Sequence, residues 1–409
     1  MNSRSHPSPY IAIACGGTGG HLFPGLAVAE QLRQRGCDVA LLISPKDVDQ
    51  QAVKGELARR AAAGAEPAAP FDIFTLPAVG LQNRNYFSFA GSFLKSLFAA
   101  KKAFRPRRPQ AVLAMGGFTS APPVLVAKER GVKTFLHESN TIPGRANRYL
   151  ARFVDEAFVG FAETAARLKK ARKVTATGTP VRPQFTRLSD TAREDAARRL
   201  GLDARRPVIL VVGGSQGASG LNAMVLSALP SLARKNWQWL HLTGANDFEK
   251  VKAAYAAVGV TAVVKPFLAE MDLALGVAAA AVSRAGASSL AELAALRLPA
   301  LLVPYPTAAD NHQFFNADAY ARSGAARILE QKGATPEQVA GMLAELMEKD
   351  SVRAPMCAAL DRWHAPKAAA DIAAQILRQV QAGADTAAAR PGPAVVAGPP
   401  VRPKNSPVV

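Results

Sequence analysis

A glycine-rich loop close to the amino terminus constrains this chain more than any other feature. The run CGGTGGH at residues 15–21 follows an apolar stretch, Tyr10–Ala14, and precedes a helix-like stretch that starts at Pro24. Glycine permits sharp turns and lets a ligand approach the main chain closely, and the N–H groups at the start of a helix attract negative charge. The pattern therefore predicts a buried strand, a loop and a helix that together hold an anionic ligand, with a tight turn that holds none as the simpler alternative.

The same order of strand, glycine pair and helix occurs twice more. The apolar run Val208–Val212 leads into GGSQGA at residues 213–218, and Ala111–Met115 leads into GGFTS at residues 116–120. Strands that alternate with helices predict parallel sheets with right-handed crossovers, and a length of 409 residues suits two domains. We therefore predict an α/β chain with two related, doubly wound units whose loops gather at one cleft.

The division of the chain follows from these runs. We expect a flexible segment at residues 1–9, a first domain at 10–178 and a second domain at 179–363, joined by the proline-stiffened run GTPVRP at 178–183. A helix should follow at about 364–381. The Ala/Pro/Gly-rich residues 382–409 should form a disordered tail, because they lack hydrophobic periodicity.

Charge and composition narrow the classes of partner. The 50 Lys and Arg residues exceed the 31 Asp and Glu residues by 19, which indicates nucleic acid, a phosphorylated substrate or a membrane surface as partner. Cys15, Cys37 and Cys357 form no CxxC pair, so we expect neither a disulfide framework nor a zinc site. No run reaches the ~18 apolar residues of a membrane span and residues 1–9 do not resemble a signal peptide, so we expect a cytoplasmic protein.

Residues 79–108 combine aromatic and basic side chains. From Ser92 onward their spacing predicts a helix. A protein that rests on an anionic bilayer presents such a combination, but a core helix with a solvated basic face would have the same pattern, and both interpretations stay open at this point. The candidate membrane-contacting residues are Leu81, Phe87, Phe89, Phe93, Lys95, Lys101, Lys102 and Arg105.

Polar side chains also cluster where predicted strands end, which is where open α/β sheets bind ligands. The run HESN at 137–140 ends one strand, and SRAGASSLAE at 283–292 opens a helix with a phosphate-type site at its start. Glu292 in that helix either meets a ligand or only complements the helix dipole. The loop at 305–317 carries Asp, Asn, His and Gln, which suits a hydroxyl-rich ligand such as a sugar. Arg182 in the linker either reaches a phosphate or base or is an ordinary surface charge.

The common nucleotide-binding motifs fit poorly. The chain has no GxxxxGK[ST], which argues against a P-loop hydrolase. The first loop is not GxGxxG, and the second strand ends in Ser44-Pro45-Lys46 rather than in an acid that would hold an NAD ribose, so an NAD(P)-dependent oxidoreductase is a weak alternative. A nucleic-acid-binding protein would explain the charge, but no motif of that class is recognisable. The loops favour group transfer between two domains, with a diphosphate site in the second.

Four motifs, taken in order, resemble those of the MurG family, the UDP-N-acetylglucosamine:lipid I N-acetylglucosaminyltransferases of bacterial peptidoglycan synthesis. They are GGTGGHLFPG at 16–25, HE at 137–138 with Asn140, GGSQGA at 213–218, and DNHQ at 310–313 with NA at 316–317. The resemblance covers about residues 10–380. It implies a GT-B fold, in which two Rossmann-like domains face a cleft and the last helix crosses back to the first domain. It also implies UDP-N-acetylglucosamine (UDP-GlcNAc) as donor and membrane-anchored lipid I as acceptor.

The resemblance further implies roles for individual residues. Ser215 and its loop should hold the donor diphosphate, Leu268 should border the uracil, and Glu292 should bind the ribose hydroxyls. The other implied donor-binding residues are Thr18, Gly19, Gly20, Asn140, Arg182, Gln216, Ala287, Ser288, Ser289, Leu290, Ala291, His312 and Gln313, and those implied for the acceptor are Gly17, Gly116, Gly117 and Glu138.

General chemistry suggests how such a transfer would run. A helix amino end disfavours a protonated imidazole, so His21 should stay neutral and accept the proton of the muramyl 4-hydroxyl. The helix after Gly217 should stabilise the leaving diphosphate without a metal or cofactor, and inversion should give a β-linked product. Two departures from the family's usual pattern stand out, namely Ser139 in place of Gln and the prolines at 122–123 in place of a more glycine-rich run.

Under this resemblance the segment 81–98, together with the basic residues at 95–108, becomes a membrane-facing patch. We then expect a peripheral protein at the cytoplasmic face of the plasma (inner) membrane that serves cell-wall biogenesis, cell shape and cell division. Other cell-wall synthesis proteins are expected partners, and nucleic acid is not. Another GT-B glycosyltransferase, with a different nucleotide sugar or lipid acceptor, shares most of these features and is the main alternative.

Overall fold

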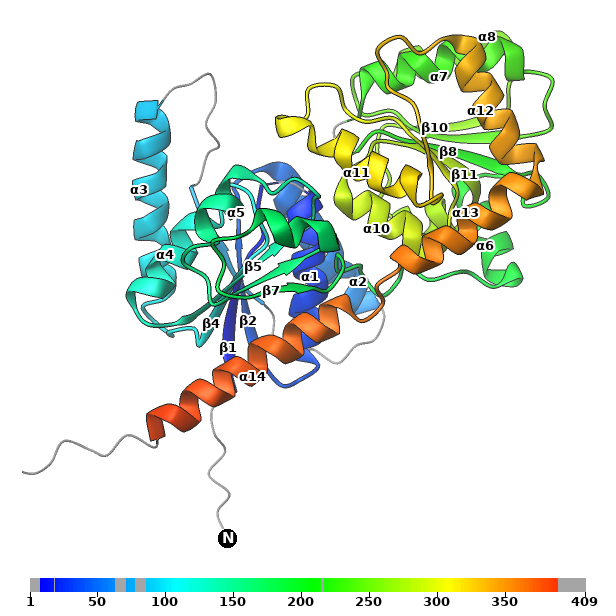
Figure 1. The fold of residues 1–409 in the computed structure, drawn as a ribbon. Helices are drawn as coiled ribbons and strands as arrows, with labels where there is room; N and C mark the ends of the chain where they lie inside the picture. Colours follow the sequence, from blue (N-terminus) through cyan, green and yellow to red (C-terminus); the bar gives the residue numbers. More distant parts are fainter. Residues whose placement is uncertain (1–7, 18, 63–70, 78–85, 215–216, 389–409) are drawn as a thin grey trace, which may run out of the picture.

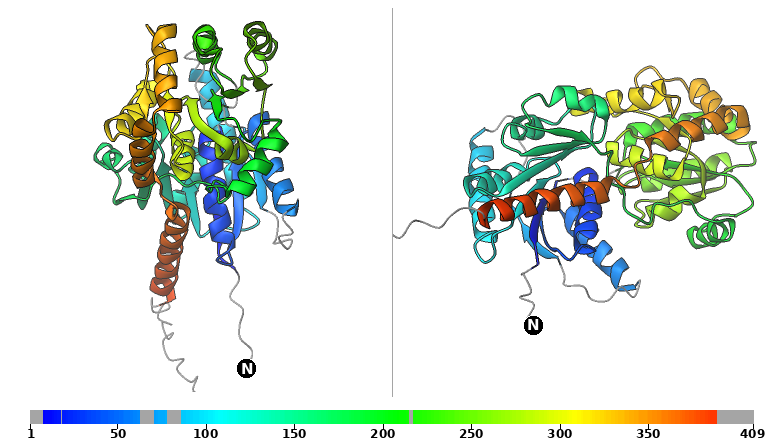
Figure 2. Two further views of the ribbon diagram at one scale, coloured as in Figure 1. Left: turned by 90° about the vertical axis from the view of Figure 1, so that its right-hand side faces the viewer. Right: turned by 60° about the horizontal axis from the view of Figure 1, so that its bottom comes forward.

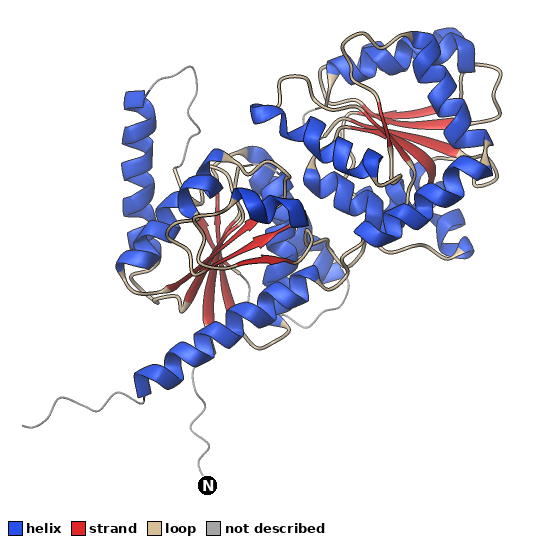
Figure 3. Ribbon diagram, viewed as in Figure 1, coloured by secondary structure: helices blue, strands red, loops and turns tan. Residues whose placement is uncertain are grey.

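The computed structural model describes residues 8–17, 19–62, 71–77, 86–214 and 217–388. These residues form two α/β units, and in each unit helices cover both faces of one sheet (Figures 1 and 3). Every strand pair in both sheets is parallel. The predicted α/β class with two doubly wound units is confirmed.

The first unit is built on a seven-stranded sheet with the order β3-β2-β1-β4-β5-β6-β7. The inner strand β1 is buried along its whole length, and Ile13 lies between Leu41 of β2 and Leu113 of β4. Such apolar runs are expected when helices cover both faces of a parallel sheet. The strands are β1 Tyr10–Ala14, β2 Asp38–Ile43, β3 Asp72–Thr75, β4 Ala111–Ala114, β5 Lys133–Glu138, β6 Glu156–Val159 and β7 Val174–Ala176.

Two separate apolar cores hold helices to the two faces of this sheet. The core on one face contains Leu26 of α1 and Val53 of α2. The core on the other face contains Phe104, which directly follows α3, and Val124 of α4. The helices of this unit are α1 Gly19–Arg33, α2 Asp47–Ala62, α3 Tyr86–Ala103, α4 Ala121–Glu129, α5 Arg145–Leu150 and the 3-10 helix η1 Ala162–Arg167.

The second unit has a six-stranded sheet with the order β10-β9-β8-β11-β12-β13. A single large core surrounds it. Its strands are β8 Val208–Val212, β9 Gln238–Leu242, β10 Ala262–Lys265, β11 Ala278–Ser283, β12 Ala300–Leu302 and β13 Arg327–Ile328. Its helices are α6 Asp190–Leu200, α7 Ser219–Leu232, α8 Phe248–Val258, α9 Met271–Val277, α10 Ala287–Leu296, η2 Ala309–Asn311, α11 His312–Arg322, α12 Pro336–Glu348 and α13 Asp350–Trp363.

The last helix, α14 Ala368–Ala388, leaves the second unit and lies along the first (Figure 2). Its residues Ile372 and Ile376 join the core that contains α1. Buried Glu156 of β6 accepts hydrogen bonds from Gln375 at 2.8 Å and Gln379 at 2.6 Å, so polar and apolar contacts together fix this helix. The helix ends at Ala388 rather than at 381, so residues 382–388, which we expected in a disordered tail, are helical.

The structure leaves other parts of the predicted division open. Residues 1–7 of the expected flexible segment and 389–409 of the expected tail lie outside the described residues, and the domain boundaries stay predictions. Among the described helices, none is both long and apolar enough to cross a membrane.

Candidate functional site

The first glycine loop packs so tightly that its second residue leaves no room for a side chain. A Cβ atom on Gly16 would lie 2.2 Å from the backbone nitrogen of Ser44, at the end of β2. Helix α1 begins at Gly19, earlier than the sequence suggested, so Gly19, Gly20 and His21 form its first turn. The N–H groups of a first turn have no partner within the helix, and these three residues therefore supply the anion-attracting end that we predicted. Thr18 lies outside the described residues.

The imidazole of His21 lies directly over the second glycine loop. A Cβ on Gly116 would lie 2.9 Å from His21 Nε2, and a Cβ on Gly117 would lie 3.1 Å from His21 Nδ1. Both glycines also have positive φ, 109° and 75°, which other residues rarely adopt. The glycine pair is thus required both by its backbone conformation and by the space that the imidazole occupies.

Burial lowers the pKa of His21 below its ordinary value, although the nearby carboxylates of Glu138 and Asp49 act in the opposite direction. Desolvation therefore acts in the same direction as the helix dipole, from which we predicted a neutral imidazole. A neutral imidazole can accept a proton, which is what general-base catalysis near neutral pH requires.

Glu138 organises the loop after β5. Its carboxylate accepts hydrogen bonds from the backbone and side chain of Asn140, from Gly144 N and from Asn147 Nδ2, all at 2.9–3.0 Å. Asn147 Nδ2 also lies 3.3 Å from a Cβ built on Gly116. Glu138 is buried, so its direct effect is to shape the loop that adjoins His21.

Arg182 links three parts of the molecule. Its guanidinium carbon lies 3.9 Å from the centre of the Phe23 ring in α1 and 4.8 Å from that of Phe185. Its Nη2 lies 3.6 Å from Glu292 Oε1 in α10, and its Nε is buried without a hydrogen-bond partner among the described residues. Both charged side chains are mostly buried, so Arg182 is part of the site rather than an ordinary surface charge.

Burial raises the pKa of Glu292 to about 7, and the neighbouring charge of Arg182 opposes this rise. Glu292 therefore changes its charge near neutral pH, which is unusual for a carboxyl group. Perturbed carboxyl groups that lie in clefts are frequent at functional sites.

The first turn of α10 contacts the first turn of α1. Ser288 Oγ donates to Gly20 O at 2.9 Å, so the amino ends of these two helices meet where the units face each other (Figure 1). Ala287, Leu290 and Leu268 are buried, while Ser289 and Ala291 are partly exposed. Ser215 and Gln216, which precede α7, lie outside the described residues.

Two further predicted residues lie at the start of α11. Gln313 Oε1 accepts from Ala285 N at 3.2 Å and from Tyr305 N at 3.0 Å, so its amide nitrogen is the group that remains for a ligand. His312 Nδ1 lies 2.8 Å from Ala309 O. Because a carbonyl only accepts, Nδ1 carries the proton and Nε2 is the acceptor.

Sequence reasoning missed the importance of Asn316, which joins the two units. Its Oδ1 accepts from Thr141 N at 2.9 Å and from Thr141 Oγ1 at 3.1 Å, and its Nδ2 donates to Asn140 Oδ1 and to Ala285 O. The side chain is fully buried. Asn316 was part of the fourth motif, but the motif gave it no role and did not show that Asn140 and Asn316 would meet.

The two departures from the family pattern have local explanations. Ser139 Oγ lies 3.2 Å from His137 Nδ1, and His137 Nε2 lies 3.1 Å from Gly178 O, so Ser139 helps to fix the histidine that holds the linker. The prolines at 122–123 occupy the first turn of α4, where a missing N–H costs nothing.

The predicted membrane patch lies largely on α3, which stands at the outer edge of the first unit (Figure 1). Among its described side chains the most exposed apolar residues are Phe98 and Leu94, at 71% and 55%, and both lie within the predicted segment 81–98. Phe89 and Phe93 are partly buried and 6.1 Å apart, Lys95, Lys102 and Arg105 are exposed, and Lys101 pairs with Glu129 at 3.0 Å. Leu81 and the side chain of Phe87 lie outside the described residues.

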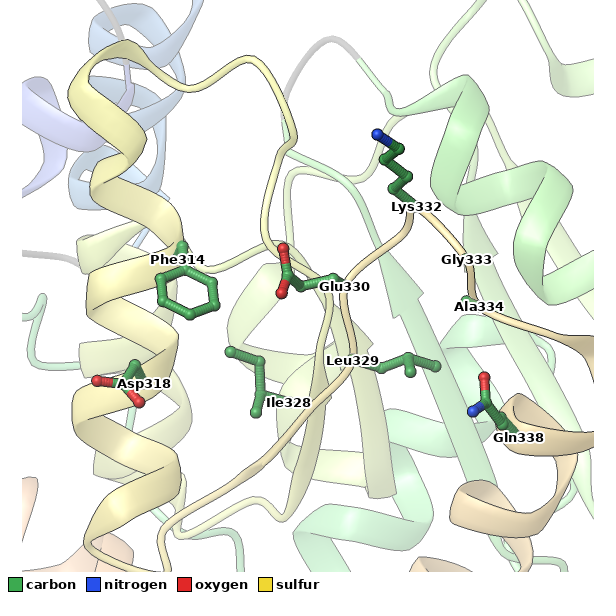
Figure 4. Close-up of a pocket in the computed structure, with 9 residues that line it drawn as sticks. All are labelled: Phe314, Asp318, Ile328, Leu329, Glu330, Lys332, Gly333, Ala334 and Gln338. Carbon is green, nitrogen blue, oxygen red and sulfur yellow. The ribbon is translucent and has the colours of Figure 1, made fainter.

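A cavity of about 270 Å³ lies apart from these residues, between α11, β13 and the start of α12 (Figure 4). Its lining includes Phe314, Glu330 and Lys332 and none of the predicted site residues. Within the described part of the chain, no group of three or more His, Cys, Asp or Glu residues is placed to hold a metal ion.

Comparison with known proteins gives consistent matches over nearly the whole chain. Residues 11–159 match the glycosyltransferase family 28 N-terminal domain, and residues 208–376 match the glycosyltransferase family 28 C-terminal domain. A relative from Anaeromyxobacter sp., named UDP-N-acetylglucosamine–N-acetylmuramyl-(pentapeptide) pyrophosphoryl-undecaprenol N-acetylglucosamine transferase, is 38% identical over 93% of this chain and 97% of its own length. A relative of the same name from Acidithiobacillus ferrooxidans is 36% identical over 89% of this chain and 96% of its own length.

Solved structures agree with these matches. The crystal structure of Acinetobacter baumannii MurG is 28% identical, covers 91% of this chain and 100% of its own, and superposes with a TM-score of 0.69. The S. aureus MnaA–UDP co-structure, at 13% identity, covers 94% of this chain and 99% of its own with a TM-score of 0.65, and it shows likeness of fold alone.

Proposed function

This chain belongs to glycosyltransferase family 28, and from that premise we propose that it transfers N-acetylglucosamine from UDP-GlcNAc to lipid I. It is an N-acetylglucosaminyltransferase of peptidoglycan synthesis with the GT-B fold. The product is lipid II, with the new sugar on the 4-hydroxyl of N-acetylmuramic acid. The observation that carries the mechanism is the partly buried imidazole of His21 over the Gly116–Gly117 loop, where burial lowers its pKa, beside the meeting point of two helix starts.

The donor is assigned mainly to the second unit. Glu292 accepts hydrogen bonds from the ribose hydroxyls, Leu268 borders the uracil, and the unpaired Nε of Arg182 is a donor for a nucleotide oxygen. Ser215 and Gln216 hold the diphosphate in front of α7, together with the N–H groups at the start of α10. Gln313, His312 and Asn140 contact the N-acetylglucosamine, because their remaining amide and imidazole groups match sugar hydroxyls.

The acceptor is assigned to the first unit. Its diphosphate lies against the first turn of α1 and the Gly116–Gly117 loop, while Glu138 supports this region by shaping the loop after β5. The N–H of Gly17 donates to Asp49 at 2.6 Å, so this group is not available to the acceptor and the start of α1 at Gly19 and Gly20 takes that role.

The reaction follows from this placement. The muramyl 4-oxygen forms a bond to the anomeric carbon as its proton passes to His21, and the bond between that carbon and the UDP oxygen breaks. Attack from the face opposite the leaving group inverts the configuration and gives a β-linkage. The leaving diphosphate gains negative charge, which backbone N–H groups at helix starts stabilise.

Membrane association is part of the proposal because the acceptor of the named relatives carries undecaprenol. We place α3 against the cytoplasmic face of the membrane, with Phe98 and Leu94 among the lipid tails and Lys102 and Arg105 near anionic headgroups. The relevant support is the combination of two strongly exposed apolar side chains with the exposed cations Lys95 and Lys102 on one helix and Arg105 directly after it.

A transfer assay with radiolabelled UDP-GlcNAc and lipid I in detergent tests the function directly. We expect labelled lipid II, and we expect transfer to continue in EDTA because the proposal gives the diphosphate charge to helix ends. A panel of other nucleotide sugars should give little product. Transfer from a different donor with no reaction of UDP-GlcNAc would instead favour another GT-B glycosyltransferase.

A further inference from the structure

Asp49 is a buried carboxylate to which the proposed transfer gives no role. It lies in the first turn of α2, and its side chain is 0% exposed. Its Oδ2 accepts hydrogen bonds from Gly17 N at 2.6 Å and from Ser44 Oγ at 2.5 Å. A buried charge is costly unless it is well hydrogen-bonded, so these contacts must account for its position.

The peptide groups of Gly16 and Gly17 are held from three sides. Asp49 accepts the N–H of Gly17, Lys46 Nζ donates to Gly17 O at 3.0 Å, and Thr119 Oγ1 donates to Gly16 O at 2.7 Å. The chain then enters α1 at Gly19. Because a glycine loop has little conformational preference of its own, its shape just before His21 depends on these neighbours.

The second carboxylate oxygen of Asp49 has no such contacts. Its Oδ1 is buried without a hydrogen-bond partner among the described residues. Leaving a buried acceptor unmatched is unfavourable, so the position of this carboxylate needs an explanation beyond its own hydrogen bonds.

From this geometry we infer that Asp49 and Lys46 act as a positioning pair. Asp49 accepts a hydrogen bond from the N–H of Gly17 and Lys46 donates one to its C=O, and together they fix the start of α1, which carries His21. The inference rests on the proposed function, since it concerns the placement of the base in that reaction. Neither residue touches substrate in this account, and both act through the loop.

Asp49 and Lys46 carry opposite charges, so replacing each should shift the pKa of His21 in opposite directions. The charged or titratable groups that act on His21 include Asp49 from α2, Glu138 and His137 from the end of β5, Lys46 from the loop after β2 and His312 from α11. A nearby negative charge favours imidazolium and a positive charge disfavours it. Loss of the Asp49 charge should therefore lower the pKa of His21, and loss of the Lys46 charge should raise it.

The test compares full-length wild-type protein with Asp49→Asn and Lys46→Met. For Asp49→Asn we expect kcat to fall by about 100-fold, the usual order for a slightly misplaced catalytic group, while the KM for UDP-GlcNAc stays near wild type. The acidic limb of the pH profile of kcat should move to lower pH in Asp49→Asn and to higher pH in Lys46→Met.

The outcomes separate this inference from the function on which it rests. A wild-type protein that transfers no sugar would contradict the proposed function. Suppose instead that the wild type transfers sugar normally. If the acidic limbs of the kcat pH profiles then stay in place, or move in the same direction in both variants, the positioning pair alone would be overturned. Lys46 is exposed, so its replacement removes little buried contact. If Asp49→Asn does not fold, a wild-type kcat and an unmoved acidic limb in Lys46→Met would overturn the inference on their own.

Discussion

At the scale of single residues, the site depends on two arrangements. One is an imidazole that lies against two glycines, and the other is a buried pair of oppositely charged side chains. The imidazole of His21 occupies the space that side chains at Gly116 and Gly117 would fill. Arg182 and Glu292 contact each other with both side chains mostly buried, and the charge of Arg182 lowers the pKa that burial gives Glu292. Small changes at these positions should therefore alter the chemistry more than the fold.

Replacement of Gly117 by Ala should impair transfer through His21. The added Cβ would lie 3.1 Å from Nδ1 of the imidazole, so we expect the ring to shift and kcat to fall by about 100-fold. Gly36→Ala is a matched control, because φ is 77° at Gly36 and 75° at Gly117, but no described atom lies within 4 Å of the added Cβ. Both variants should lose about 1–2 kcal/mol of stability for the left-handed backbone, and only Gly117→Ala should lose turnover. Equal kcat in the two variants would contradict this interpretation.

Binding of UDP-GlcNAc should strengthen as pH rises through about 7. Burial gives Glu292 a pKa of about 7, so the protonated form prevails below that value and the ionised form, the better acceptor for ribose hydroxyls, prevails above it. The donor itself has no group that titrates in this range. Calorimetry from pH 6 to pH 8 should show this rise in wild type and a flat profile in Glu292→Gln. A flat wild-type profile would remove Glu292 as a titrating donor contact.

At the scale of elements, helix starts and one long helix determine how the units work together. Helices α1 and α10 meet through Ser288 and Gly20, and α14 returns from the second unit to pack on the first. Although burial alone raises the pKa of Glu156, hydrogen bonds from Thr175, Gln375 and Lys173 lower it below its usual value. Glu156 is therefore an ionised, well-paired anchor for α14.

Replacement of Glu156 by Ala should destabilise the first unit. Gln375 and Gln379 would each lose their acceptor at the interface between α14 and the sheet, and we expect a loss of about 3 kcal/mol in the free energy of unfolding. Denaturant titration measures this loss. Glu163→Ala is the control, since its exposed pair with Arg322 is 3.7 Å long and should contribute under about 1 kcal/mol. Similar values for the two variants would show that Glu156 does not anchor α14.

At the scale of the whole molecule, polar contacts join the two units, and the chain as a whole carries a large positive charge. Asn316 and Ser288 hydrogen-bond across the junction, and Arg148 pairs with Asp310 at 2.5 Å. The Arg148–Asp310 pair is partly exposed and contributes little by itself, whereas the Asn316 contacts are fully buried. The large net positive charge of the chain favours an anionic surface.

Reversal of two charges near the end of α3 should weaken membrane binding. We expect Lys102→Glu with Arg105→Glu to reduce co-sedimentation with anionic liposomes, because each basic residue near such a surface contributes about 1 kcal/mol. Lys250→Glu with Lys252→Glu, on exposed positions of α8 in the second unit, changes the net charge equally and should bind as wild type does. Equal loss in both double variants would mean that net charge rather than α3 directs binding.

Features with a local signature could be predicted from the sequence, whereas features that depend on contacts between distant segments could not. Apolar runs that end in Gly-Gly predicted both parallel sheets, because a buried strand and a tight loop each have a strong local signature. The meeting of Asn140 with Asn316, the position of His21 over Gly117, and the burial that raises the pKa of Glu292 depend on contacts between segments far apart in the chain. Which residues of the predicted segment 81–98 are exposed could not be read from the sequence, because the same spacing also fits a core helix.

The central claim is that His21 receives the acceptor proton while the second unit holds the donor. A single-turnover measurement with UDP-GlcNAc bound to His21→Ala tests it most directly, with donor affinity determined on the same sample. The account predicts donor affinity close to wild type and a transfer rate lower by about 10²–10⁴-fold, the range for loss of a general base. A transfer rate equal to that of wild type at full donor occupancy would contradict it.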